Sequence, residues 1–167
     1  SNLLEKTGHK VTKEYYINDA GSQINNLTNS VFIRYQEILG EKFSAYPDDF
    51  YPGDYLMPVA QHFASTYGSK LLEMNESERF LLIKPFTINF MVNLIKEDLA
   101  ALSIKQDIFV SEQDLINDGK IDKAIATLQK SNLIYEGVLD PPKGKRPDDW
   151  EPRPQMLFRS TKYGDEV

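Results

Sequence analysis

The chain has 167 residues, and its 25 acidic and 19 basic side chains give a formal net charge of −6. An acidic balance argues against a free-standing nucleic-acid-binding protein, whose affinity depends largely on Lys and Arg at phosphates. Without cysteine the chain has neither disulfides nor a Cys-ligated metal, and its longest apolar run, around residues 80–83, is too short to cross a membrane. No secretory signal is visible, so we expect a soluble, cytoplasmic protein with one core or one core and a smaller appendage.

The first forty residues predict a helix end, a strand, a turn and a second helix. Residues 1–7 followed by Gly8 have the pattern of a helix C-terminus. Segment 11–17 has the β-branched and aromatic composition of a strand. From Ser22 onward apolar residues recur with helical spacing, and Gly40 is a suitable stop for this helix. The recurring residues are Ile24, Leu27, Val31, Tyr35 and Ile38.

The turn at residues 18–21 joins the carboxyl end of the predicted strand to the amino end of the predicted helix. In an open α/β sheet ligands bind beyond the carboxyl ends of the strands, and a helix N-terminus offers N–H groups to a polar ligand. The same residues, Asn-Asp-Ala-Gly, are also common in an ordinary turn with a helix N-cap. The residues alone leave both interpretations open and favour the ordinary turn.

The middle of the chain predicts an ordered loop followed by two helices. Residues 41–55 are aromatic, acidic and rich in Pro and Gly, whereas disordered segments are poor in aromatics. Asp54 is a candidate cap for a helix that reaches about Tyr67. A longer helix is predicted from Pro85, as its first-turn residue, to Leu102. The inward residues are expected to be Leu56, Val59, Phe63 and Tyr67 in the first helix, and Met91, Leu94, Ile95, Leu99 and Leu102 in the second.

The last sixty residues predict a small α+β unit. Its elements are a strand at 107–111, a helix at 120–130 with Ile121, Ile125 and Leu128 inward, and strands at 133–138 and 155–160. Residues 140–154 hold five of the nine prolines, which is typical of a hairpin tip or a linker.

Motifs of common catalytic and metal sites are absent. The sequence has no glycine-rich nucleotide loop, no zinc-protease helix and no serine-hydrolase elbow. Segment 114–125 weakly resembles a calcium loop, but Ile116 and Ile125 stand at ligand positions, so no metal site is predicted. We interpret His62 as a surface or packing residue, because a catalytic histidine needs an oriented partner. His9 is interpreted as a helix-end residue that the helix dipole stabilises.

Two sets of cations are candidates for RNA contact. Lys145 and Arg146 belong to the single basic cluster of the sequence, residues 143–146. Acidic neighbours follow this cluster, and they favour a solvated loop over a phosphate contact. Arg159 and Lys162 can likewise contact either a phosphate or the acidic residues Asp165 and Glu166 that follow them. A structural ion pair with these acidic residues is favoured.

Five blocks of sequence carry a family resemblance. They are Gly8–Val11, Asn18–Gln23, Tyr51–Tyr55, Phe109–Glu112 and Phe158–Glu166. In this order and with these spacers they resemble arginyl-tRNA synthetase, a class I aminoacyl-tRNA synthetase, and the bacterial form resembles them most. The family's His-x-Gly-His and Lys-Met-Ser-Lys signatures are absent from the chain, so the resemblance implies an internal fragment.

The resemblance implies an α/β fold in two parts. Residues 1–40 are expected to be a remnant of a Rossmann-type nucleotide-binding domain, in which residues 1–7 end the helix of the first signature. Residues 41–167 are expected to form an inserted α+β connective domain with its Pro-rich loop at 140–154.

The resemblance also implies an arginine–tRNA ligase, which activates arginine with ATP and magnesium and transfers it to tRNA. Asn18, Asp19, Gly21 and Gln23 are then expected to face the adenylate or the tRNA end. The fragment contains no expected catalytic residue or metal ligand. It should be inactive alone, because the two absent signatures hold the phosphates whose electrostatic stabilisation is the main part of such catalysis.

One alternative from another functional class stays open. It is a stand-alone, non-catalytic module derived from the synthetase that binds RNA or a protein. A complete domain would not expose the edges of its first strand, whereas in the truncated ligase the strand at 11–17 is expected to lack its parallel neighbours. Such an open edge predicts strand pairing with a second molecule and hence self-association.

Overall fold

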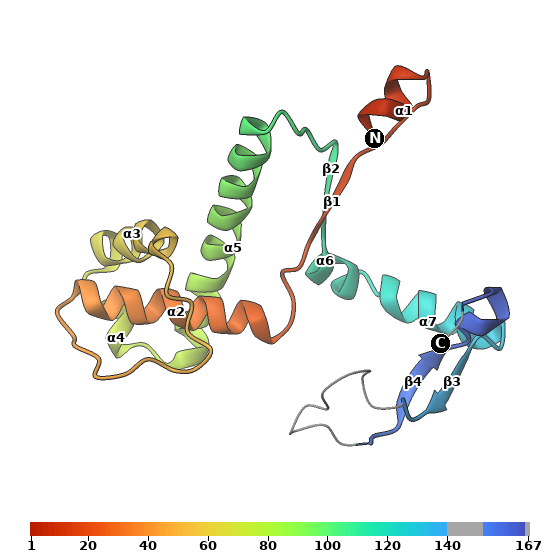
Figure 1. Ribbon diagram of the computed structural model, residues 1–167. Coiled ribbons are helices and arrows are strands. Elements are labelled where there is room, and N and C mark those ends of the chain that lie inside the picture. Colours follow the sequence, from red (N-terminus) through yellow and green to blue (C-terminus); the bar gives the residue numbers. More distant parts are fainter. Residues whose placement is uncertain (140–151, 166–167) are drawn as a thin grey trace. The chain divides into compact units, whose positions relative to one another are not determined.

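The computed structural model describes residues 1–139 and 152–165 (Figure 1). Two compact units can be distinguished by their internal packing, Ser1–Asp114 and Leu115–Val167. The candidate RNA contacts Lys145 and Arg146, and most of the predicted loop 140–154, lie outside the described residues. The assignment of residues 1–40 to a nucleotide-binding domain and of 41–167 to an insertion stays a prediction.

The first unit combines a small parallel sheet with a helical core. Its elements are α1 (Asn2–Lys6), β1 (Glu14–Ile17), α2 (Ser22–Ile38), η1 (Asp54–Leu56), α3 (Met57–Tyr67), α4 (Lys70–Glu73), α5 (Glu76–Ala101) and β2 (Ile108–Ser111), with the start of α6 (Glu112–Asn117). The predicted bounds of α2 are confirmed. The helix ends at Leu39, and Gly40 follows with φ of 99°, a conformation that favours glycine.

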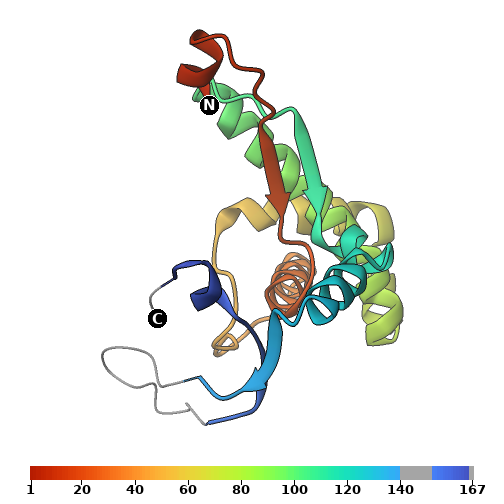
Figure 2. The ribbon, with the colours of Figure 1, turned by 90° about the vertical axis from the view of Figure 1, so that its right-hand side faces the viewer.

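The expectation that β1 lacks a parallel neighbour is wrong. β1 pairs in parallel with β2, and the register joins Glu14 to Ile108 and Ile17 to Ser111. Figure 2 shows the two strands side by side and running in the same direction. The rings of Tyr15 and Phe109 lie 5.5 Å apart on one face of this pair. One edge of β1 is therefore occupied within the chain, which removes that edge as a ground for expecting self-association.

A single hydrophobic cluster holds the helices of the first unit together. α2 packs against α3 and α5, and the buried apolar side chains are Val31, Tyr35, Leu56, Val59, Ala60, Phe63, Leu71 and Ile83. The Tyr35 hydroxyl, which is fully buried, donates to the carbonyl of Gly68 at 2.6 Å, so the cluster contains no unsatisfied phenol. The predicted inward residues of the first two helices therefore form most of this core.

The predicted start of the long helix at Pro85 is wrong. α5 begins nine residues earlier, at Glu76, where the Asn75 side chain accepts a hydrogen bond from the Glu78 N–H at 2.9 Å. Asn75 is a strong N-cap, and acidic residues in the first turn complement the helix dipole. Pro85 cannot donate to the Leu81 carbonyl, but both residues are exposed, so water can satisfy that carbonyl.

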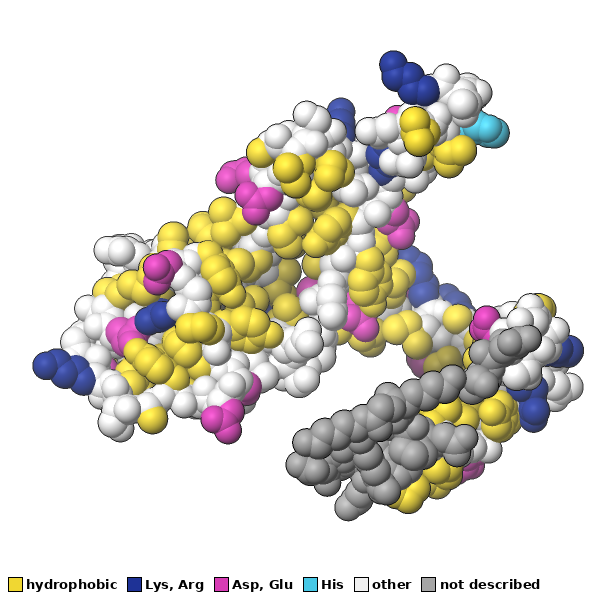
Figure 3. All heavy atoms as spheres, in the orientation of Figure 1, with side chains coloured by type: hydrophobic (Ala, Val, Ile, Leu, Met, Phe, Trp, Pro, Cys, Tyr) yellow, Lys and Arg dark blue, Asp and Glu magenta, His cyan; other side chains and the backbone are white. Residues whose placement is uncertain are grey.

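The predicted core stripe of α5 is confirmed only in part, because Met91, Leu94, Ile95 and Leu99 are half-buried and Leu102 is exposed. The fully buried side chains of α5 are Ile83 and Thr87, in its first half. Met91 packs partly against the cluster, whereas Leu102 is 72% exposed. Figure 3 shows apolar side chains, in yellow, on the surface that is turned toward the viewer. From the second half of α5, the Lys96 ammonium lies 4.5 Å from the centre of the Phe109 ring of β2.

Asp54 does not cap α3 as predicted. It is the first residue of the short 3-10 helix η1, and no side-chain hydrogen bond caps η1 or α3. Leu56 precedes α3 and is fully buried, and Pro58 lies in the first turn of the helix, where a missing N–H has no cost. The burial of Leu56 thus fixes the chain entry into α3 by packing instead of by a cap.

Residues 41–53 form the ordered loop that the sequence predicts, and contacts to α2 fix it. Arg34 donates to the Pro52 carbonyl at 2.7 Å and to the Glu37 carboxylate at 2.8 Å. The Tyr46 hydroxyl donates to the other oxygen of Glu37, and the Tyr46 ring stacks on Phe50 at 4.3 Å. The Arg34–Glu37 ion pair on the helix therefore holds the middle of the loop at Tyr46 and its end at Pro52.

This ion pair predicts a loss of stability in acid. Burial raises the pKa of Glu37, but the hydrogen bonds from Tyr46 and Arg34 and the charge of Arg34 outweigh it, so the pKa lies below its ordinary value of 4.5. A lowered pKa contributes stability above the unfolded value, and this contribution is lost as the pH falls through the folded value. We expect Glu37→Gln to be less stable than wild type at pH 7, with the difference shrinking below about pH 4.5.

Urea unfolding followed by circular dichroism from pH 7 to pH 3 measures this difference. Glu73→Gln is the matched control, because Glu73 is an exposed carboxylate without these contacts among the described residues. A stability gap between Glu37→Gln and wild type that stays constant over this pH range would contradict the prediction.

The second unit is a small α+β arrangement, but the predicted unit was wrong in one strand, because the strand at 107–111 lies in the first unit and pairs with β1. It holds α7 (Lys120–Lys130), β3 (Ile134–Gly137), β4 (Gln155–Phe158) and the 3-10 helix η2 (Ser160–Tyr163). β3 and β4 pair in antiparallel fashion, with Ile134 opposite Phe158. Ile125 and Leu128 of α7 are half-buried as expected, but Ile121 is exposed, so its predicted inward position is wrong.

Candidate functional site

The turn between β1 and α2 lies at the edge where both parallel strands end. β1 ends at Ile17 and β2 at Ser111, and these two residues are paired in the register. The turn therefore has the position in which open α/β sheets bind ligands. This geometry places the four candidate residues, Asn18, Asp19, Gly21 and Gln23, next to one another along the chain at that edge.

Asp19 differs from the other three candidates because it is buried, with 8% of its surface exposed. Its Oδ2 accepts a hydrogen bond from the Ser111 hydroxyl at 2.6 Å, and its Oδ1 accepts from the Gln113 N–H at 2.8 Å. The Ser111 oxygen in turn accepts from the Asp114 N–H at 3.0 Å. Both oxygens of Asp19 are thus used to join the turn after β1 to the start of α6 after β2.

Asn18, Gly21 and Gln23 are exposed. Gly21 is the residue before α2 and has φ of 87°, which an L side chain rarely adopts. No side-chain hydrogen bond caps this end of α2, so neither Asp19 nor Asn18 acts as the expected N-cap. The first N–H groups of a 17-residue helix and two amide side chains therefore face outward together at this turn.

Tyr16 and Glu112 add a second polar pair at the same end of the strands. Tyr16 is half-exposed on β1, and Glu112 begins α6 directly after β2. Desolvation, the charge of Glu112 and a hydrogen bond with it, and then the charge of Asp19, raise the pKa of Tyr16 above its usual 10.0. Tyr16 therefore keeps its proton at neutral pH and offers a hydroxyl beside the turn.

A hollow of about 310 Å³ opens beside the Asp19 network. Its lining residues are Asp19, Phe80, Leu81, Lys84, Pro85, Ile88, Ser111, Gln113 and Asp114. The walls from α5 are mainly apolar, and Lys84 supplies a single ammonium group. A volume near 300 Å³ is at the lower end for small-molecule sites. The site can therefore admit one small apolar or aromatic group next to the polar turn.

Sequence reasoning missed the residues that come from β2, α5 and α6. Ser111 and Glu112 stand in one of the five sequence blocks, but no role was predicted for them. Their partners Asp19 and Tyr16 are more than ninety residues away in the sequence. The signal that could have found them is a Ser-Glu pair directly after a short strand, the same strand-to-helix arrangement that marked the first turn.

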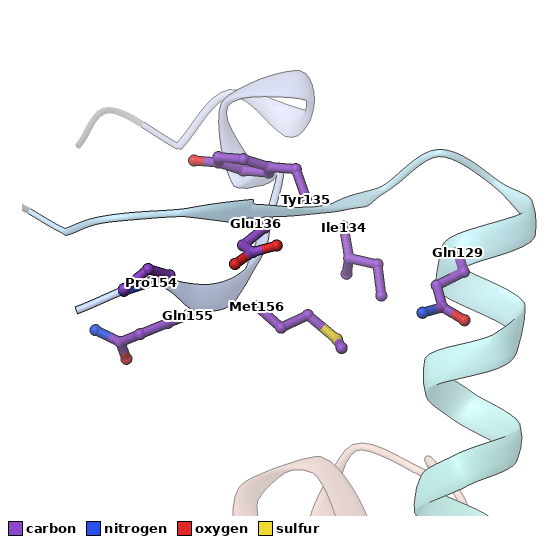
Figure 4. Close-up of a pocket in the computed structure, with 7 residues that line it drawn as sticks. All are labelled: Gln129, Ile134, Tyr135, Glu136, Pro154, Gln155 and Met156. Carbon is purple, nitrogen blue, oxygen red and sulfur yellow. The ribbon is translucent and has the colours of Figure 1, made fainter.

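A second hollow, of about 360 Å³, lies in the second unit (Figure 4). Ile134 and Met156 point to one side of the β3–β4 hairpin, toward Gln129 of α7, whereas Tyr135 points to the opposite side. Among the described lining residues, Glu136 and Tyr135 are the ionisable groups. This hollow has no pair of groups that acid–base or metal chemistry would need.

Within residues 1–139 and 152–165, no group of three or more His, Cys, Asp and Glu could hold a metal ion. His62 stacks on Phe86 at 4.1 Å, which confirms the packing role predicted for it. Over the same described residues, no helix has the length and apolarity needed to span a membrane.

Comparisons with known proteins give a consistent result. No protein-family model matches the chain. An arginine–tRNA ligase of Rickettsia bellii strain OSU 85-389 is 54% identical over 166 residues, 99% of this chain and 29% of that protein. An arginine–tRNA ligase of Rickettsia prowazekii is 52% identical over 163 residues, 98% of this chain and 28% of that protein.

A solved structure agrees with these relatives. A Campylobacter jejuni protein provisionally described as an arginyl-tRNA synthetase matches 98% of this chain with a TM-score of 0.72 and 27% identity, over 32% of its own length. The mixed α/β fold is therefore that of a part of this protein. The chain spans less than a third of each relative, and over that span its sequence and fold are similar to those of arginine–tRNA ligases (arginyl-tRNA synthetases).

Proposed function

We propose that the chain is part of an arginine–tRNA ligase, a cytoplasmic enzyme that activates arginine with ATP and magnesium and transfers it to tRNA. The observation that carries the proposal is 54% identity over 99% of the chain to a protein with that name. The chain covers only 29% of that relative, so the activity belongs to a longer protein and the segment alone is inactive.

The parallel pair supports a Rossmann-type origin for part of the first unit. β1 and β2 are parallel, which needs a long connection such as α2 to α5, and parallel sheets are typical of nucleotide-binding domains. In this proposal the nucleotide-binding part comprises residues 1–40 together with β2. The remaining residues of 41–167 form the inserted α+β connective part.

The exposed groups of the turn fit a polar ligand. Asn18 and Gln23 offer amides, Gly21 permits close approach, and the start of α2 offers N–H groups. We propose that these three residues face the adenylate or the tRNA end, and that Asp19 positions them by anchoring the turn to Ser111 and Gln113. Lys145 and Arg146 remain proposed RNA contacts.

ATP and magnesium fit this segment only in part. The adenylate's sugar and base can use amides and the apolar hollow, but a triphosphate with magnesium needs several cations or carboxylates around it. Lys84 is the single cation that lines the hollow. In the proposal, the rest of the parent enzyme holds the triphosphate, where ATP supplies the energy for joining arginine to tRNA.

Charging assays on two proteins test this proposal. The 167-residue chain is expected to give no arginine-dependent pyrophosphate exchange and no charging of an arginine tRNA transcript. The whole product of its source gene is expected to give both, with lysine in place of arginine as the control amino acid. Charging with another amino acid only, or no charging by the whole product, would refute the function.

Sequencing the source gene on both sides separates the two functional classes. One open frame with a His-x-Gly-His motif upstream and a Lys-Met-Ser-Lys loop downstream supports the ligase. Start and stop codons at the ends of this segment would instead support the separate RNA- or protein-binding module.

A further inference from the structure

The turn after β4 in the second unit is held in a defined shape. The Arg159 N–H donates to the Leu133 carbonyl at 2.7 Å, which ties the turn to the start of β3. The 3-10 helix η2 closes with a hydrogen bond from the Gly164 N–H to the Thr161 carbonyl at 3.2 Å. Gly164 has φ of 87°, so it fits this ending without strain. The side chains of residues 159–162 therefore project from a fixed backbone.

This turn borders a hollow of about 350 Å³ that is rich in donors. Its lining residues are Tyr135, Phe158, Arg159, Ser160, Thr161 and Lys162. A guanidinium, an ammonium and the hydroxyls of Ser, Thr and Tyr all donate hydrogen bonds, and none of the described lining residues carries a carboxylate. Such a set of groups is complementary to an anion with several oxygens.

The two cations of the hollow have no acidic partner in the part of the chain that the structure describes. Among the described residues, neither Arg159 nor Lys162 has a carboxylate within ion-pair distance. The expected pairing with Asp165 is therefore wrong, and Glu166 lies outside the described residues. The Arg159 guanidinium instead lies over the Tyr135 ring, 4.5 Å from its centre, which holds it in place and leaves its charge available.

Exposed rings accompany these cations. Tyr135, Phe158 and Tyr163 are 39%, 46% and 67% exposed, and the last two rings stack with their planes 6° apart. Aromatic side chains next to Arg and Lys form the surfaces on which nucleic-acid strands bind, with phosphates at the cations and bases at the rings. A small inorganic anion would not need the rings.

The charge of the chain also favours a polyanion at the second unit. Leu115–Val167 has nine Lys and Arg and nine Asp and Glu, whereas Ser1–Asp114 has ten against sixteen. The whole net charge of −6 therefore resides in the first unit. A polyanion is repelled by the first unit and meets no net repulsion at the second.

We propose that the hollow at Arg159 and Lys162 is an RNA-binding site that holds a backbone phosphate of a tRNA strand. Lys162 supplies a point charge, Arg159 supplies paired N–H donors fixed on Tyr135, and the hydroxyls of Ser160 and Thr161 complete the contacts. This site is separate from the turn at Asn18 to Gln23. It rests on the proposed function in one respect, which is that the RNA is a tRNA.

Salt-dependent RNA binding by the 167-residue chain tests this site. The probe is a fluorescein-labelled arginine tRNA transcript, titrated at several salt concentrations. Lys162→Gln is expected to weaken binding about fivefold at 0.1 M salt and to reduce the slope of log K against log salt by about 0.7 to 0.9, the effect of one lost phosphate contact. Arg159→Gln is expected to act similarly, and Arg159→Lys is expected to restore most of the slope.

The matched control is Lys123→Gln, which removes the same charge from an exposed position on α7. It should leave the salt slope within error of wild type. Equal slopes for wild type, Lys162→Gln and Arg159→Gln, or no RNA binding by the wild-type chain, would overturn the inference. Arginine charging by the whole gene product is measured separately. If tRNA is charged but the salt slopes of the variants equal that of wild type, only the RNA site is refuted. If the salt slopes change but no tRNA is charged, only the ligase function is refuted.

Discussion

Replacing Asp19 with alanine is expected to lower the free energy of unfolding of the first unit by about 3 kcal/mol. The buried carboxylate accepts from the Ser111 hydroxyl at 2.6 Å and from the Gln113 N–H at 2.8 Å. A hydrogen bond to a charged group contributes about 1.5 to 3 kcal/mol, and removing one partner leaves a buried donor unsatisfied. Urea unfolding followed by circular dichroism at pH 7 measures the loss.

Two further substitutions separate a structural role of Asp19 from ligand contact. Asp19→Asn keeps an acceptor oxygen, so it should cost less than Asp19→Ala. Gln23→Ala, at an exposed site of the same turn, should leave stability within about 0.5 kcal/mol. If the turn faces a ligand, Gln23→Ala should still slow arginine charging by the whole gene product about tenfold, the effect of one lost hydrogen bond.

Two other results for the Asp19→Ala variants would instead support a ligand contact by Asp19, like that proposed for Asn18, Gly21 and Gln23. An Asp19→Ala chain as stable as wild type would show that its two hydrogen bonds do not support the fold. A whole gene product with Asp19→Ala that retains its stability and loses only charging would have the same meaning.

Replacing Ile83 with alanine is expected to cost about 3 to 4 kcal/mol, whereas Leu102→Ala should change stability by less than about 0.5 kcal/mol. Ile83 is 1% exposed in the core between α2, α3 and α5, so its loss leaves a cavity. Leu102 is 72% exposed beyond the end of α5. Both residues have large aliphatic side chains, which makes the pair a matched test of where the core lies.

Thermal and urea unfolding of the two variants give the comparison. Ile83→Val, which removes one methylene, should fall between them at about 1 kcal/mol. A larger loss for Leu102→Ala than for Ile83→Ala would restore the core stripe that the helical spacing predicts for the second half of α5.

The candidate site was only half predictable from the sequence. The turn at residues 18–21 was marked by a strand that runs directly into a helix, and the structure places it at the edge where β1 and β2 end. The sequence could not show that Asp19 turns inward while Asn18 and Gln23 stay exposed. That choice depends on Ser111 and Gln113, which are brought to Asp19 by a pairing over more than ninety residues.

The sequence by itself determined the local elements. The spacing of Val31 and Tyr35 predicted the buried face of α2, and α7 runs over the predicted residues, 120–130. These features follow from helical periodicity and end residues, which act within a few positions along the chain. The five sequence blocks likewise carried the resemblance to the family, since order and spacing along the chain need no tertiary contact.

Only the tertiary structure decided which apolar faces are buried and which polar groups meet. The helix α5, which starts at Glu76 and has Pro85 inside it, is stable because Ile83 and Thr87 pack in the core while Pro85 faces water. Leu102 has the spacing of a core residue, but it is 72% exposed among the described residues. Periodicity shows that one face of a helix is apolar. That face is buried only where another element packs against it, and this packing depends on contacts between residues far apart in the sequence.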